Sequence, residues 1–192
     1  GSLTYFSLGE VYMDYTGEDD PYYNAQTINP YEMSVDLAYS LMLSEKFSLA
    51  AGIRYILSDM SYSSDEEKAT SGAFAADLAW YYQDYLNIGQ RECQLGLGMN
   101  VSNVGSKITY SGSNYSEFIP TNLRLGASLM IPVNEYNRFT IAADANKLLV
   151  PTRPKRRDGE SPEDFAVREQ RDYYDVSSIA GIFKSFSDAA KM

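Results

Sequence analysis

Histidine is absent from this sequence of 192 residues, and cysteine occurs once, at Cys93. Without histidine the chain lacks the commonest general base and every Ser–His or Cys–His nucleophile pair. A single cysteine permits no internal disulfide, and with histidine missing a zinc or iron–sulfur centre is nearly excluded. Only carboxylates could then act in catalysis, and we interpret Asp36, Asp77, Glu92 and Asp144 as charges neutralised by arginine instead of acid–base groups. We therefore expect no catalytic residue, no metal site and no cofactor, and we predict that the protein is not an enzyme.

Long apolar runs and an excess of positive charge are missing as well. The formal net charge is −10 and the isoelectric point about 4.5, which argues against nucleic acid as a partner because phosphates need a basic face. Mean hydropathy is −0.34, and no stretch approaches the roughly 18 apolar residues that a transmembrane helix needs. The sequence also contains no segment that we interpret as a signal peptide.

Tyrosine is the residue type that stands out. The chain holds 17 tyrosines, and aromatic residues make up 14% of it. An acidic, tyrosine-rich chain of modest hydropathy suits two classes of protein. One is a soluble all-β domain, and the other is a transmembrane β-barrel, in which alternation dilutes the apolar residues and hides them from a hydropathy scan.

Apolar and polar residues alternate along most of the chain, and the clearest example is residues 32–44. A strict period of two indicates a strand, and thirteen residues at about 3.3 Å each span roughly 43 Å. That length is unusual for a globular strand and suits a tilted membrane strand. About eight such strands are predicted. They cover residues 3–13, 32–44, 47–58, 72–83, 90–102, 121–131, 137–147 and about 174–186.

The two faces of these strands differ in character. One face is apolar, and the other is rich in Gly, Ala, Ser and Asn with roughly one charge per strand. The apolar face, which we expect to contact lipid, includes Leu37, Leu41, Leu49, Ile53, Leu97, Leu125, Leu129 and Ile141. The charges expected inside a barrel are Asp36, Arg54, Asp77, Glu92, Arg124 and Asp144. Both arginines should lie within reach of a carboxylate or a backbone carbonyl, because buried charges persist only when paired.

The connections alternate in length, which is typical of an outer-membrane barrel. Short ones are predicted at 44–46, 84–89 and 132–136, and long ones at 14–30, 59–71, 103–118 and 148–173. Aromatic residues flank both ends, as interfacial girdles do. They are Phe47, Tyr82, Tyr85, Tyr136 and Phe139 near the short turns, and Tyr12, Tyr15, Tyr31, Tyr62 and Phe118 near the long loops. A soluble β-sandwich or a lipocalin-like barrel remains an alternative.

The last long loop, 148–173, differs from the others. Ser161 followed by Pro162 and two acids is a helix start signal, so a short helix is predicted over about 162–172. It is either an ordinary capped loop helix or an ordered platform for a partner protein. The residues expected to bind that partner are Lys155, Arg156, Arg157, Phe165, Tyr173 and Tyr174.

Several stretches together resemble one family over residues 3 to 188. They are YFSLGEV at 5–11, LSEKFS at 43–48, GIRYILSD at 52–59, SNVGSKI at 102–108, EFIPTNLRLG at 117–126 and ADANKLLVPT at 143–152. They resemble the PorV (LptO) family, β-barrel proteins of the outer membrane in the type IX secretion system of Bacteroidota. The resemblance implies fourteen-stranded barrels related to the long-chain fatty acid transporters. On that basis residues 1–192 form one incomplete, antiparallel up-and-down barrel segment, and 148–173 is an extracellular loop.

The same resemblance implies binding in place of chemistry. Such proteins collect secreted cargo from the translocon by its C-terminal signal domain and deliver it to a cell-surface complex that contains a sortase-like peptidase. The expected partners are therefore cargo, translocon, peptidase and membrane lipid, and the expected location is the bacterial outer membrane. Two other functions stay open: an outer-membrane channel for hydrophobic solutes, and a soluble ligand-binding β-domain.

Overall fold

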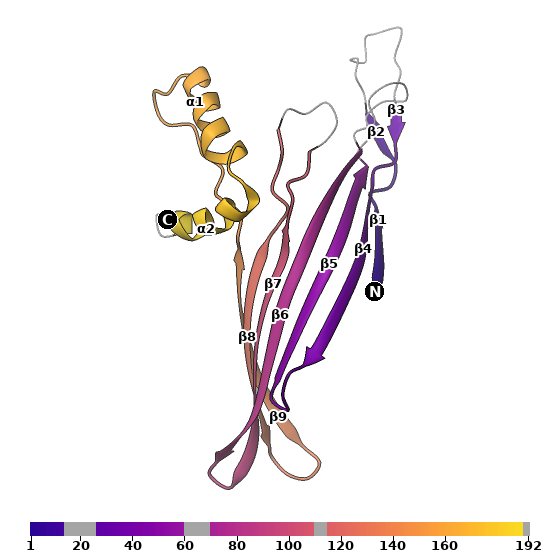
Figure 1. Ribbon diagram of the computed structural model, residues 1–192, viewed down its shortest axis with the longest axis vertical. Coiled ribbons are helices and arrows are strands. Elements are labelled where there is room, and N and C mark those ends of the chain that lie inside the picture. The colour runs from indigo at the N-terminus through magenta and orange to yellow at the C-terminus, as the bar shows by residue number, and fades with distance from the viewer. Residues whose placement is uncertain (14–25, 60–69, 110–114, 190–192) are drawn as a thin grey trace.

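A curled antiparallel sheet of seven strands dominates the computed structural model, which describes residues 1–13, 26–59, 70–109 and 115–189 (Figure 1). The strand order is β1-β4-β5-β6-β7-β8-β9, and β2 and β3 form a separate two-stranded sheet. The predicted all-β, up-and-down barrel segment is thus confirmed. The strands are β1 (Ser2–Ser7), β2 (Val11–Met13), β3 (Gln26–Ile28), β4 (Tyr31–Met42), β5 (Phe47–Asp59), β6 (Thr70–Ile88), β7 (Arg91–Gly105), β8 (Asn122–Pro132) and β9 (Arg138–Leu148).

The strand register keeps residues of like character together. Leu37 lies opposite Ile53, and Asp36 lies opposite Arg54. Because successive side chains point to opposite faces, Leu41 and Asp36 are on different faces of β4. The apolar face is uncovered along much of its length, and several of its large side chains are exposed. Among them are Leu37, Leu41, Ile53, Leu125 and Ile141.

Short hairpins gather at one end of the sheet, and the longer connections with the helices gather at the other (Figure 1). The hairpin between β6 and β7 is tighter than the predicted 84–89, because β6 continues to Ile88 and the chain reverses over Gly89 and Gln90. Gly89 has a φ of +66°, a conformation that glycine adopts without steric cost. The hairpin end and the opposite end are the two places where the predicted aromatic residues lie. Tyr15 and Tyr62, however, fall outside the described residues.

The first predicted strand, 3–13, is wrong as a single element. The structure divides it into β1 and β2, and Gly9, at a φ of +78°, lies in the break. β2 then leaves the main sheet and pairs with β3, a strand of three residues that the sequence pattern did not predict. Ser7 and Gly9 stand where the face of Leu3 and Val11 should continue with apolar residues, so the alternation is interrupted at the bend.

The last predicted strand, about 174–186, is also wrong. This segment contains the end of a π-helical turn (Gln170–Tyr174) and the helix α2 (Ser178–Ala189). Ile179, Ile182, Phe183 and Phe186 follow the spacing i, i+3, i+4 and i+7, which is a helical period. Ser177 accepts a hydrogen bond from the backbone N–H of Ala180 at 3.3 Å and starts the helix.

The helix predicted over 162–172 is confirmed in type. α1 covers Pro162–Glu169, and the chain continues as the π-helical turn instead of more α-helix. Ser161 is the N-cap, and its hydroxyl accepts a hydrogen bond from the backbone N–H of Asp164 at 3.1 Å. Pro162 occupies the first turn, where its missing N–H costs nothing. Among the described residues, no helix has the length and apolar character needed to cross a membrane.

A small apolar cluster fixes the connection between β7 and β8 over the polar face of the sheet. Ala73 and Ala75 of β6 pack with Ile119, and Ile56 and Ile108 lie against them. The backbones of β6 and β7 approach closely at Gly105, where an added Cβ would lie 1.9 Å from the carbonyl oxygen of Phe74. Ile108 and Ile119 therefore anchor the described parts of this connection, 106–109 and 115–121, on the sheet.

Gly105 and Gly98 of β7 provide a matched test of this close approach. Gly105→Ala should lower the free energy of unfolding by about 1–3 kcal/mol, because β6 must shift to admit the methyl group. Gly98→Ala should change it little, since its new Cβ would find its nearest atom at 3.8 Å. Urea unfolding of the full-length protein in lipid vesicles measures both variants. Equal effects of the two substitutions would contradict the packing described here.

Candidate functional site

Arg54 is the centre of a charged cluster on the polar face of the sheet. Its guanidinium donates hydrogen bonds to Asp36 on β4, to Asp77 on β6 at 3.3 Å and to the side chain of Asn103 on β7. Asp77 also accepts a hydrogen bond from the backbone N–H of Asn103 at 2.8 Å. One cation thus joins side chains from four consecutive strands, and the predicted pairing of Arg54 is confirmed.

The local backbone explains how Asn103 reaches the cluster. The register between β6 and β7 shifts between Ala76 and Leu78, and Asn103 has a φ of +57°. Asparagine tolerates this left-handed conformation better than most residues, and a bulge here re-aims its side chain toward Arg54. A hollow of about 580 Å³ lies on this face, lined by residues of β1, β4 and β5 together with Asp77, Asn103 and Pro120.

The other predicted charges do not join the cluster. Arg124 lies opposite Asn100 and Asn146, is exposed, and forms no ion pair with any residue the structure describes. The expectation that Arg124 is paired is therefore wrong. Asp144 lies opposite Gly126, one diagonal step away from Arg124, and Glu92 is exposed near the β6–β7 hairpin. Two neighbouring strands bring carboxylates beside Arg54, whereas both strands beside Arg124 place an amide opposite it.

The second half of the site is a cap at the long-loop end of the sheet, which we define as residues 106–109, 115–121 and 149–189. Its anchor is Lys107, whose ammonium donates to the backbone carbonyls of Tyr174 at 2.8 Å and Tyr173 at 3.5 Å. The same ammonium lies 4.1 Å from the centre of the Phe118 ring. Burial lowers the pKa of Lys107 below its ordinary value, although Glu117 and Asp175 nearby oppose that shift.

Tyr173 contacts the same part of the β7–β8 connection as Lys107 does. Its hydroxyl donates to Glu117 at 3.1 Å, and its ring meets the Phe118 ring edge-on with centroids 5.3 Å apart. Burial raises the pKa of Tyr173 to about 12, and the negative charge of Glu117 acts in the same direction. Sequence analysis did not identify Lys107 or Glu117, because their partners lie more than 50 residues away along the chain.

Ion pairs hold the remainder of the cap in shape. Arg153 bonds the carboxylate of Glu169 at 2.7 Å and the hydroxyl of Tyr174. Arg168 forms a bidentate pair with Glu160, with both N–O distances at 2.7 Å, and this pair lowers the pKa of Glu160 to about 2. The chain from β9 to α2 is therefore an ordered structure built on β7 and β8.

The residues predicted to bind a partner divide into two groups. Lys155, Arg156 and Arg157 are exposed on the turn before α1, and we call them the basic triplet. Tyr173 is 7% exposed and points into the cap, as does much of Tyr174. Phe165 is half-buried, with the guanidinium of Arg168 5.4 Å from its ring centre. The exposed charged members of this set are thus the three basic residues, whereas Tyr173 lies inside the cap.

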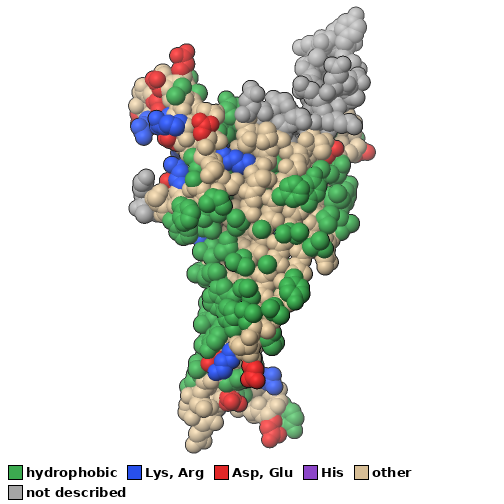
Figure 2. Space-filling model, viewed as in Figure 1, with side chains coloured by type: hydrophobic (Ala, Val, Ile, Leu, Met, Phe, Trp, Pro, Cys, Tyr) green, Lys and Arg blue, Asp and Glu red, His purple; other side chains and the backbone are tan. Residues whose placement is uncertain are grey.

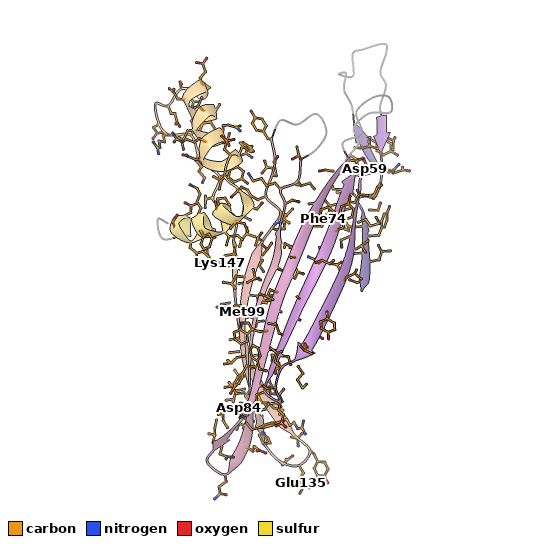
Figure 3. All side chains as sticks on the ribbon, viewed as in Figure 1. Asp59, Phe74, Asp84, Met99, Glu135 and Lys147 are labelled. Carbon is orange, nitrogen blue, oxygen red and sulfur yellow. The ribbon has the colours of Figure 1, made fainter. Side chains whose placement is uncertain are left out.

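Figure 3 shows how the side chains are distributed along the molecule, with Asp84 and Glu135 at the hairpin end and Asp59 at the opposite end. Within the described residues, no group of three or more cysteine, aspartate or glutamate side chains is arranged to hold a metal ion.

Comparison with known proteins identifies a family. The model of a family described as "Type IX secretion system protein PorV" matches residues 1–155. This range contains every strand of the sheet and the first residues of the cap, and it ends before α1. A search of curated proteins found no match.

Arg54→Met should destabilise the sheet. The substitution leaves Asp36 and Asp77 facing each other without a cation, which should lower the free energy of unfolding by about 2 kcal/mol at neutral pH. Arg124→Met removes the same charge from an unpaired position and should cost less than about 0.5 kcal/mol. Urea unfolding of the full-length protein compares the two. Adding Asp36→Asn and Asp77→Asn to Arg54→Met should restore part of the loss, and no restoration would contradict the charge argument.

The raised pKa of Tyr173 predicts how the cap responds to alkali. An unfolded tyrosine loses its proton near pH 10, whereas Tyr173 in the folded cap keeps it to about 12. Between these values the folded cap binds more protons than the unfolded one, so its free energy of unfolding falls as the pH rises. Phenolate absorbance of the full-length protein and of Tyr173→Phe should differ by one group titrating at about 12. A difference curve centred near 10 would show that the ring is not buried.

Proposed function

Because this chain belongs to the PorV family of type IX secretion system proteins, we propose that it forms part of an outer-membrane barrel that binds secreted cargo and delivers it to the cell surface. Cargo is recognised by its C-terminal signal domain, and the receiving complex contains a sortase-like peptidase. Family membership implies a component of that secretion system in the outer membrane. Recognition and delivery of cargo by this chain are the parts that we propose.

The uncovered apolar face of the sheet supports placement in the membrane. Leu37, Ile53 and Ile141 are each more than half exposed, so this face needs an apolar surrounding that the described residues do not supply. Figure 2 shows hydrophobic side chains spread over the sheet, with charged side chains gathered near its two ends. A band of apolar surface between two charged ends is what a barrel presents to a bilayer.

The polar face is the proposed lumen. It carries the Arg54 cluster, the hollow of about 580 Å³ and many small residues, and Ile108 and Ile119 pack against it at one end. On this proposal Asp36, Arg54, Asp77, Glu92, Arg124 and Asp144 are lumenal charges. Arg54 joins carboxylates of neighbouring strands, so on this proposal these charges serve to hold the strands together.

The observation that carries the docking proposal is the cap with its exposed basic triplet. The protein has a net charge of −10, yet Lys155, Arg156 and Arg157 stand together on the surface of an ordered segment. A local basic site on an acidic protein selects acidic partners and steers their approach. We propose that this surface, at the extracellular end, docks the cargo signal domain or the sortase-like peptidase.

A channel for hydrophobic solutes is the second candidate function. The hollow of about 580 Å³ on the polar face is the space through which such a solute would pass. It offers room for an acyl chain. Fatty acid uptake by vesicles that contain the full-length protein, with no binding of a signal domain, would favour this second function.

Two neighbouring alanines of β9 test which face meets lipid. Ala143 is on the apolar face and Ala142 on the polar face, and both are exposed near the middle of the strand. Ala143→Arg should lower the free energy of unfolding in vesicles by about 2–4 kcal/mol, because a guanidinium enters the hydrocarbon layer. Ala142→Arg should have a much smaller effect. Urea unfolding of the full-length variants measures both, and a reversed order would place the polar face against lipid.

Charge reversal tests the docking surface. Arg156→Glu with Arg157→Glu should weaken binding to a purified type IX signal domain by about tenfold, and should impair attachment of cargo at the cell surface. Arg91→Glu with Arg138→Glu makes the same change in net charge at the hairpin end and should leave binding intact. Pull-down and surface labelling of full-length variants in cells give the two measurements.

A deletion provides the stricter form of this test. Removing 153–170 should leave the barrel folded and inserted, because loops tolerate changes in length. It should nevertheless abolish cargo attachment. Normal attachment by this deletion variant would place the docking site elsewhere.

A further inference from the structure

Helix α2 has its apolar stripe on the outside. Ile179, Phe183 and Phe186 are 57%, 72% and 47% exposed, whereas Gly181 and Ser185 on the opposite side are buried against the cap. A surface helix normally buries its apolar stripe and exposes its polar one. The inverted arrangement costs free energy in water, so the stripe needs an apolar surrounding beyond the cap.

The orientation of α2 is fixed by close packing. A Cβ added to Gly181 would lie 2.7 Å from the Phe118 ring and 3.1 Å from Pro151. Glycine therefore allows the helix to lie directly on these two residues of the cap. Asp188 accepts a hydrogen bond from the backbone N–H of Thr152 at 3.1 Å. Rotation of the helix to bury Phe183 would break both contacts.

The exposed stripe carries no charge and no unpaired hydroxyl. The charged residues of α2, Lys184 and Asp188, lie on another side of the helix, which is half-buried beside a hollow that Asp172 also lines. Ser185 donates to the carbonyl of Ile182 at 2.7 Å, and Ser187 donates to that of Lys184 at 2.9 Å. Transfer of this stripe into an apolar medium would therefore leave no polar side chain without a partner.

The stripe continues the apolar face of the sheet. Lys147 lies on that face of β9, opposite Leu123, and its ammonium donates to the carbonyl of Ser185 at 3.3 Å. The same ammonium lies 5.2 Å from the centre of the Phe186 ring. Figure 2 shows hydrophobic side chains extending from α2 down the neighbouring edge of the sheet. A lysine whose stem lies on an apolar surface and whose charge turns to a carbonyl is typical of the boundary between lipid and water.

We propose that α2 is an interfacial helix whose stripe of Ile179, Phe183 and Phe186 inserts into the acyl chains of the membrane beside the barrel. This inference rests on the proposed membrane placement of the sheet. Twelve residues make a helix about 18 Å long, which is too short to cross a bilayer and suited to lying in its surface. The helix would hold the cap, and with it the basic triplet, at a fixed height above the lipid.

Nitroxide labels on the full-length protein test the proposal. Cys93→Ser removes the native thiol, and single cysteines are then placed by Phe183→Cys or Ile179→Cys on the stripe. Ile141→Cys on the apolar face of β9 serves as the lipid reference, and Asp158→Cys on the exposed turn before α1 as the water reference. Relaxation by oxygen and by a water-soluble nickel chelate is measured in phosphatidylethanolamine–phosphatidylglycerol vesicles.

The proposal expects both stripe labels to behave like the Ile141 label, with strong relaxation by oxygen and loss of relaxation by nickel. Stripe labels that nickel reaches as readily as at Asp158 would place α2 in water and overturn the proposal. Labels that are immobile and shielded from both reagents would show that protein covers the stripe, which also overturns it. A nickel-accessible label at Ile141 would overturn the membrane placement itself, which separates that failure from a failure of the α2 inference alone.

Discussion

Arg54 joins four strands of the sheet, and the arrangement of the whole polar face depends on that contact. Its guanidinium meets carboxylates on the strands to either side, and reaches Asn103 on the strand beyond. The two carboxylates would repel each other without the cation, and the cation would be poorly solvated without the carboxylates. Small residues such as Gly52 and Ala75 surround the cluster, so nothing bulky prevents these side chains from converging. The bulge at Asn103 then starts the segment that carries Lys107.

Much of the sheet could be predicted from the sequence, because period-two alternation is a local signal. Strands β4, β5, β7, β8 and β9 fall within three residues of their predicted bounds. Alternation predicted the wrong element where a break in the strand or a helical period determined the structure. The first strand bends at Gly9, where Ser7 and Gly9 interrupt its apolar face, and Phe183 and Phe186 fit a helical spacing in place of a period of two. Ser161 and Pro162 predict the start of α1 correctly, because a helix cap acts within four residues.

The site was harder to predict, because its contacts join distant parts of the chain. The pairing of Arg54 followed from one charge per strand on a shared face, which is a property of the sheet. The same argument failed for Arg124, since the residues opposite it are amides. The bonds from Lys107 to the carbonyls near Tyr173 depend on how a helical segment packs against a loop, and no pattern in either segment encodes that meeting. The sequence predicts Tyr173 on a partner surface, whereas its hydroxyl and ring are engaged inside the cap.

The cap therefore separates the groups that fix it from the groups that it displays. Lys107 and Tyr173 join its β7–β8 part to the segment after β9, and the Arg153–Glu169 and Arg168–Glu160 pairs stiffen that segment. The side chains of the basic triplet form none of these ion pairs. A side chain that already bonds within the protein would have to break that bond before it met a partner, which weakens binding. Lys155 and Arg157 contact Arg168 and Glu160 through backbone atoms, whereas the guanidinium of Arg156 donates to the carbonyl of Glu160 at 2.8 Å. An ordered segment that keeps its charged side chains available is preorganised for docking, and this physical property supports the proposed function most directly.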